Sequence, residues 1–72
     1  MKRMGVVKVD TWKIRMMVAD QMLSLFALAG IAGTSRQTIS MILRRGSCDL
    51  FTAGKLAKAL GVPVSEIVIP EE

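Results

Sequence analysis

The chain has 72 residues, 51% of them hydrophobic, and a formal net charge of +4, so it has room for a single domain over residues 1–72 and none for a second catalytic or ligand-sensing domain. This apolar fraction is too high for a disordered chain, yet charged residues interrupt every apolar stretch before the roughly 18 residues that a membrane span requires. The chain contains no His and one Cys, which excludes a zinc site and the Cys/His or Ser/His pairs of nucleophilic enzymes, and we expect no metal, no cofactor and no catalytic activity.

An extended segment and a helix are predicted first along the chain. Residues 4–9, MGVVKV, are rich in β-branched side chains and favour an N-terminal extended arm. Asp10 or Thr11 is suited to cap a helix over about residues 11–21. The inner face of this helix consists of Ile14, Met17, Val18 and Gln21, whereas Trp12, Met16 and Ala19 make its outer side apolar as well.

A second helix is predicted over residues 24–32, and it has almost no hydrophilic side. Ala29 is small enough for another helix to approach closely at that point. Gly33, four residues later, can take the left-handed conformation that turns the chain.

A third helix is predicted over residues 35–45, and its two faces differ in polarity. Its apolar stripe consists of Ile39, Ile42 and Leu43, and the opposite face carries Arg36, Gln37, Ser40, Met41 and Arg44. Thr34 or Ser35 is a suitable N-cap, and Gly46 suits the end of the helix. One face is therefore expected to pack and the other to be free for recognition.

The remainder of the chain predicts two more helices. Asp49 is suited to cap a helix over residues 50–60, with Ala53, Leu56, Ala57 and Leu60 inside and Lys55 and Lys58 outside. Pro63 favours a short last helix over about residues 63–68. Residues 67–69 are β-branched and can pair as a strand with residues 6–9; the alternative is two frayed ends.

The segment 24–46 resembles the helix-turn-helix of the Cro/CI-type repressors, the XRE class, and the resemblance extends over about residues 12–68. It depends on Ser24, Leu28, Ala29, Gly33, the stretch SRQTIS at 35–40, Ile42, Gly46, KLAKALGV at 55–62 and SEI at 65–67. The resemblance implies an all-α, compact five-helix lambda-repressor-like DNA-binding domain whose third helix lies in the major groove. The chain departs from the family at Leu25, where a phosphate-contacting Gln is common, at Phe26, often acidic, and at Met22, commonly Gly.

The exposed face of the third helix is predicted to contact DNA. Arg36 can form two hydrogen bonds to guanine O6 and N7, Gln37 can do the same to adenine, and Met41 can lie against a thymine methyl. Solvated side chains are the alternative for Arg36 and Gln37, and an exposed or interface methionine is the alternative for Met41. We predict base contacts from Arg36, Gln37, Ser40 and Met41, and DNA backbone contacts from Thr34, Ser35, Thr38, Arg44, Arg45 and Lys55.

Positive charge is concentrated around this helix. Residues 36–58 contain five Lys or Arg side chains against one acid, Asp49. DNA binding requires such a surface because Lys and Arg displace condensed counterions. Charge alone would favour a basic soluble protein, and its coincidence with the helix-turn-helix favours DNA binding. Lys2 and Arg3 can reach DNA as a flexible arm, and a disordered basic start is the alternative.

Some large apolar side chains cannot all lie inside a domain this small. They are Trp12, Met16, Met22, Leu25 and Phe26, which we predict to form a partner interface. A homodimer would bury them and place two recognition helices about 34–36 Å apart on a palindrome. A different protein partner is the alternative.

These features predict a cytoplasmic, sequence-specific regulator that binds double-stranded DNA, a repressor acting by operator occupancy as a homodimer. The rival is an antitoxin-like or adaptor interaction module that has kept the fold but lost the DNA face. We expect no membrane association, no export signal and no small-molecule ligand. Cys48 is expected to be an incidental reduced thiol, since redox sensing would require Arg44 or Arg45 to lower its pKa.

Overall fold

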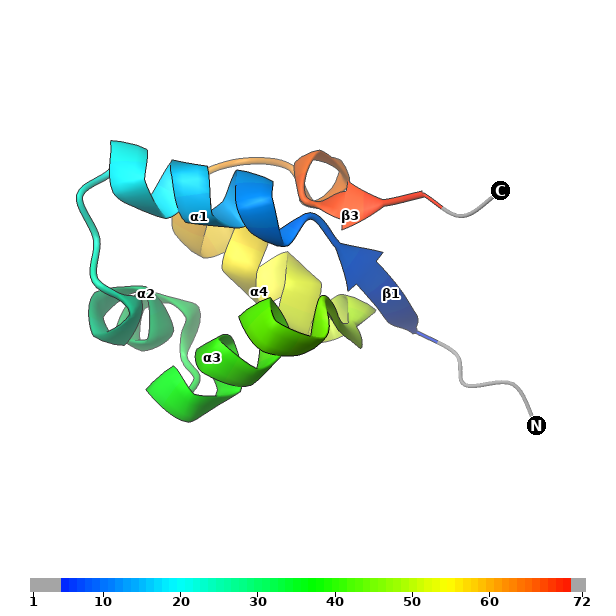
Figure 1. Cartoon of the computed structure of the whole chain (residues 1–72), viewed down its shortest axis with the longest axis horizontal. Helices are drawn as coiled ribbons and strands as arrows, with labels where there is room; N and C mark the ends of the chain where they lie inside the picture. Colours follow the sequence, from blue (N-terminus) through cyan, green and yellow to red (C-terminus); the bar gives the residue numbers. More distant parts are fainter. Residues whose placement is uncertain (1–4, 71–72) are drawn as a thin grey trace.

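The computed structural model describes residues 5–70, which form four α-helices and three short strands (Figure 1). The helices are α1 (Thr11–Asp20), α2 (Leu25–Ala32), α3 (Arg36–Arg45) and α4 (Leu50–Leu60), and the strands are β1 (Val6–Val9), β2 (Ser47–Asp49) and β3 (Val68–Ile69). These helices begin and end within one residue of the predicted bounds.

Each α-helix starts at a side chain that accepts a hydrogen bond from the backbone N–H three residues later, because the first N–H groups of a helix have no partner inside it. The capping residues are Asp10, Ser24, Ser35 and Asp49, with donor–acceptor distances of 3.0 to 3.1 Å. The end of α1 is unusual, since Met22 follows it with φ at 55°, a left-handed conformation that a Cβ atom disfavours.

The core draws one fully buried large side chain from each helix and one from the C-terminal segment. These side chains are Ile14, Leu28, Ile39, Leu56 and Ile67. Burying a side chain of this size stabilises the fold by about 1.5–3 kcal/mol. The amide of Gln21 adds a polar link, donating to the Leu60 carbonyl at 2.8 Å and joining the ends of α1 and α4.

A small antiparallel sheet in the order β2-β1-β3 lies at the opposite end of the long axis from α2 (Figure 1). The expected pairing of the two terminal segments is present, with Val9 opposite Val68 in register. Strand β2 was not predicted; it pairs Cys48 with Val7. The Val9 N–H also donates to the Gly46 carbonyl at 3.0 Å, so the sheet is tied to the end of α3.

The C-terminal segment corrects the prediction of an all-α domain with five helices. Where a helix was expected over residues 63–68, the chain forms one turn of 3-10 helix, η1 (Val64–Glu66), followed by β3. The β-branched side chains of Val68 and Ile69 favour extended backbone, and β1 supplies them with an antiparallel partner. Pairing in the sheet therefore prevails over continued helix.

Candidate nucleic-acid interface

The turn between α2 and α3 fixes how the two helices cross. Gly33 leaves α2 with φ at 75°, and its N–H donates to the Gly30 carbonyl at 3.3 Å. The next N–H, of Thr34, donates to the Ala29 carbonyl at 2.9 Å. Ala29 is buried, so its small side chain allows the close crossing of α2 and α3 that Figure 1 shows. The turn expected at Gly33 is present.

Helix α3 separates its side chains into a packed face and a free face. Ile39, Ile42 and Leu43 are buried, as the spacing predicts. We call the opposite face, Arg36, Gln37, Ser40, Met41 and Arg44, the reading face; all of these residues are exposed except Ser40, which is half-buried. The structure therefore brings all four residues predicted to contact bases onto one side of α3.

The predicted backbone-contacting hydroxyls lie at the start of α3. The Ser35 oxygen accepts from the Thr38 N–H at 3.1 Å and shares a second hydrogen bond with the Thr38 hydroxyl at 2.9 Å. Ser35 is exposed, and Thr34 and Thr38 are half-buried. Ser35 thus stabilises the first turn of α3 while keeping an accessible hydroxyl beside Arg36.

The cations of α3 have no acidic partner among the described residues. Within residues 5–70 the ion pair is Lys13–Glu66, at 2.9 Å on the surface of α1 and η1. Arg36, Arg44 and Arg45 make no such pair there and are exposed. Their charges are therefore available to an external anion such as a DNA phosphate.

Lys55, the remaining predicted phosphate contact, lies on α4. Its ammonium group is 5.1 Å from the centroid of the Phe51 ring, a cation–π distance. Together with Lys58 and Ile31 it lines a groove between α4 and the end of α2. The structure thus groups Lys55 with Lys58, and the predicted arm residues Lys2 and Arg3 lie outside the described part of the chain.

Cys48 is in an environment that disfavours the thiolate. It is half-buried in β2, and burial together with the Asp49 carboxylate raises the pKa of its thiol. Redox sensing requires the opposite shift. The lowered pKa that would mark Cys48 as a redox sensor is therefore not found.

The five residues predicted as a partner interface come from α1, the turn after it and α2, and they differ in exposure. Leu25 is half-buried and packs against the core, so it does not belong to the exposed set. Met22 is 91% exposed in the turn after α1, and Trp12 and Met16 are exposed on α1 itself. Phe26, on α2, faces the start of α3 instead.

Other exposed apolar side chains were missed from the sequence. They are Val6, Ile31, Leu50, Phe51 and Ile69. Helical spacing carried a signal for Phe51, which does not fall on the stripe formed by the inward residues of α4. Leu50 is three residues before the buried Ala53, so spacing gave no sign of its exposure.

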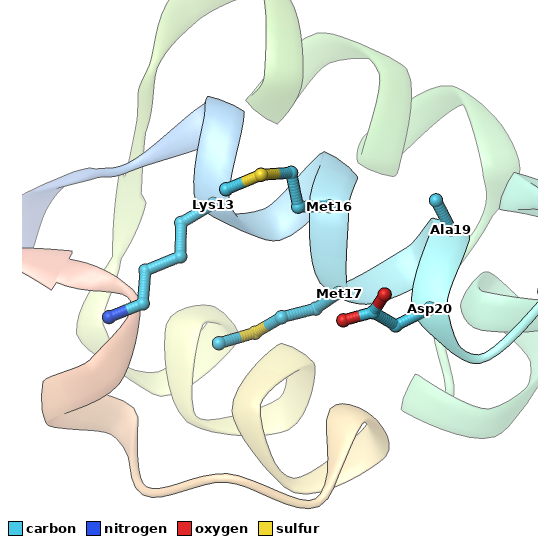
Figure 2. A pocket seen from close by; sticks show the side chains of 5 residues that line it. All are labelled: Lys13, Met16, Met17, Ala19 and Asp20. Atoms are coloured by element: carbon cyan, nitrogen blue, oxygen red, sulfur yellow. The ribbon is translucent and has the colours of Figure 1, made fainter.

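A groove of about 390 Å³ runs along α1, lined by Lys13, Met16, Met17, Ala19 and Asp20 (Figure 2). Met17 packs against the core, whereas Lys13 extends toward Glu66 on η1. The groove is mostly apolar with one charge of each sign at its edges, which suits a protein partner better than DNA.

A second groove, which we call the Phe26 groove, has a volume of about 320 Å³. Phe26 of α2 lines it together with Ser35, Arg36 and Gln37 at the start of α3. Phe26 is therefore next to the reading face.

Two helices crossing at a glycine turn, the second with a buried inner face and an exposed cationic outer face, define a helix-turn-helix DNA-binding domain. A family model described as helix-turn-helix matches residues 14–67, and the chain belongs to this family, the XRE class of DNA-binding transcription regulators. Searches of curated proteins and of solved structures gave no match.

None of the described helices is by itself long and apolar enough to cross a membrane. Helices α1 and α2 reach the length and apolar composition of a span only when they are taken together, and the pair is bent by 98°.

Proposed function

We propose that this chain recognises a specific double-stranded DNA sequence with the reading face of α3 and represses transcription by occupying an operator. The observation that carries the proposal is the exposed, unpaired state of the reading face within the described residues. Arg36 is suited to guanine, Gln37 to adenine, and Met41 to a thymine methyl. Ser40, halfway along the same face, supplies a hydroxyl for either kind of base pair.

The DNA backbone would be held on both sides of these base contacts. Arg44 and Arg45 at the end of α3 supply charge, and the hydroxyls of Thr34, Ser35 and Thr38 supply hydrogen bonds at its start. Lys55, which lies over Phe51 on α4, would add a flanking phosphate contact. These contacts position α3 without reading sequence.

We further propose that the repressor is a homodimer. Trp12 and Met16 expose apolar surface on α1 that a second copy would cover. Two copies related by a two-fold axis would present their α3 helices to half-sites about 34–36 Å apart. Sedimentation of the full chain tests this: wild type should be dimeric, and Trp12→Asp should shift it to monomer. A monomeric wild type would contradict the proposal.

The DNA proposal is tested by selecting bound fragments from a random pool and measuring their affinities at fixed salt. Replacing Arg36 and Gln37 with Ala removes two bidentate contacts and should weaken binding to the selected site by about 100-fold or more. Arg15→Ala, which removes an exposed arginine from α1, is the matched control and should have little effect. Unchanged binding by the double variant would contradict sequence reading by α3.

A second candidate is an antitoxin-like or adaptor module that binds another protein. The groove on α1 next to Met16, with exposed Trp12 on the same helix, favours it. In that case an unrelated chain should co-purify with wild type. Trp12→Asp should abolish the complex, and the Arg36/Gln37 double variant should retain it. The reverse pattern would support the repressor.

A further inference from the structure

The Phe26 groove extends the candidate interface from α3 onto α2. Phe26 is 74% exposed, although its ring is among the largest apolar groups of the chain. The opposite wall of the groove is the first turn of α3, with Ser35, Arg36 and Gln37. An exposed ring therefore lies directly across from two residues of the reading face.

Gly30 keeps this groove open. It lies inside α2, one helical turn after Phe26, and lines the groove. A Cβ atom at this position would meet nothing within 4 Å, so the fold does not require glycine there. Glycine in a helix is less stable than alanine, and a side chain at position 30 would project into the groove.

The surroundings of the groove favour a strand of DNA over an apolar partner. Among residues 5–70 no acidic side chain lines it, and Arg36 brings positive charge to its edge. Arg36 and Gln37 also belong to the reading face, so a strand whose bases they contact would continue into the groove. Its phosphates would meet the hydroxyl of Ser35, and its deoxyribose carbons would meet an aromatic ring.

We propose that the Phe26 groove holds the sugar–phosphate backbone of one DNA strand, with the Phe26 ring packed on a deoxyribose and Gly30 providing clearance. The inference rests on the proposed function, and it adds an apolar contact from α2 that contributes affinity without reading sequence. Phe26, first interpreted as part of a protein interface, is thereby assigned to DNA.

The salt dependence of binding to the selected site tests the contact at Phe26. Phe26→Ala should weaken binding by about tenfold, equivalent to about 1.4 kcal/mol, without changing the slope of log K against log salt. Phe26→Lys should steepen that slope by about 0.9 because it adds one phosphate contact. Ile31→Ala is the matched control, since Ile31 is an exposed apolar residue of α2 outside the groove.

Side chains of different size at position 30 test whether Gly30 provides clearance for DNA. Gly30→Ala and Gly30→Leu should both raise thermal stability, since neither disturbs the packing at Cβ, yet Gly30→Leu should weaken DNA binding by about tenfold or more. Thermal unfolding confirms that both variants fold.

Two outcomes separate the inference from the function on which it rests. If wild type binds a selected fragment but Phe26→Ala and Gly30→Leu bind it as tightly, the Phe26 groove does not hold DNA. The same conclusion follows if Phe26→Ala abolishes self-association and leaves DNA affinity unchanged. If wild type binds no fragment, the proposed function itself is wrong.

Discussion

Helices α2 and α3 begin and end in the same way, but the side chains that they expose differ in polarity. Ser24 and Ser35 cap them in the same way, and glycines at φ of 75° and 76° end them. Helix α2 is apolar on all sides and exposes Phe26 and Ile31, whereas α3 exposes arginine and polar side chains. Caps and turns therefore give the motif its shape, while the outward side chains distinguish α3 as the helix proposed to read DNA.

The largest expected effects concern the feature that both helices share, their contribution to the core. Leu28 of α2 and Ile39 of α3 are both fully buried. Leu28→Ala and Ile39→Ala should each lower the free energy of unfolding by about 2–5 kcal/mol. Urea denaturation followed by circular dichroism measures this. If only one of the two substitutions lowered the free energy of unfolding, the two helices would not contribute equally to the core.

The next effect separates charge from shape on α3. Arg36→Lys keeps the positive charge but loses the planar fork proposed to contact guanine. Discrimination between the selected site and a variant of its guanine should fall by about 1–3 kcal/mol, with the salt slope unchanged. Competition binding at several salt concentrations measures both quantities. A changed slope with intact discrimination would mean that Arg36 contacts phosphate rather than a base.

The two serine caps should differ slightly in how much they stabilise the fold. Ser24→Ala and Ser35→Ala each remove an acceptor for one N–H and should lower the free energy of unfolding by about 1 kcal/mol. Ser35→Ala also deprives the Thr38 hydroxyl of its partner, so its loss should be the larger. Thermal melts of both variants provide the comparison, and equal losses would argue against a role for the hydroxyl pair.

The turns that precede α2 and α3 differ in the residue that takes a positive φ, and this difference predicts opposite effects of substitution on stability. Met22, before α2, and Gly33, before α3, both have positive φ, but only Met22 has a Cβ atom. Met22→Gly should raise stability by about 0.5–1 kcal/mol and Gly33→Ala should lower it by a similar amount. Denaturant midpoints test both changes. A destabilised Met22→Gly would show that the methionine side chain makes a stabilising contact.

The smallest effect concerns pH. Hydrogen bonds from the Thr52 hydroxyl and N–H hold the pKa of Asp49 below its ordinary value. A lowered pKa in the folded state means that this stabilisation is present at neutral pH and is lost as the pH falls below about 4. The caps of α2 and α3 carry no titratable group, so among α2, α3 and α4 only α4 should weaken at its start. Asp49→Asn should show a shallower loss of stability in acid than wild type.

Periodicity and capping chemistry predicted the four α-helices. Each helix has a polar N-cap, and three of them end at a glycine in the left-handed conformation. The failures came from long-range pairing. Residues 47–49 carry no strand signal of their own and extend because β1 lies beside them. The expected last helix gives way to η1 and β3 for the same reason.

The candidate site was predictable along a single helix and not between helices. The reading face follows from positions three and four apart in α3, and every member lies where the spacing places it. The proximity of Phe26 to Arg36 depends on how α2 crosses α3, and that angle is set in three dimensions by Gly33 and Ala29. Composition alone grouped Phe26 with Trp12, which lies on a different helix.

The sheet at the far end of the molecule also sets an order of events during folding. The four helices form from contacts that are close in sequence, whereas β1 pairs with segments from the middle and the end of the chain. Contacts between distant segments form slowly because a large loop must close first. The Val9 amide, which finds its acceptor at Gly46, should therefore be among the last to gain protection from hydrogen exchange during refolding. The helix-turn-helix would therefore form before β1 pairs with β2 and β3.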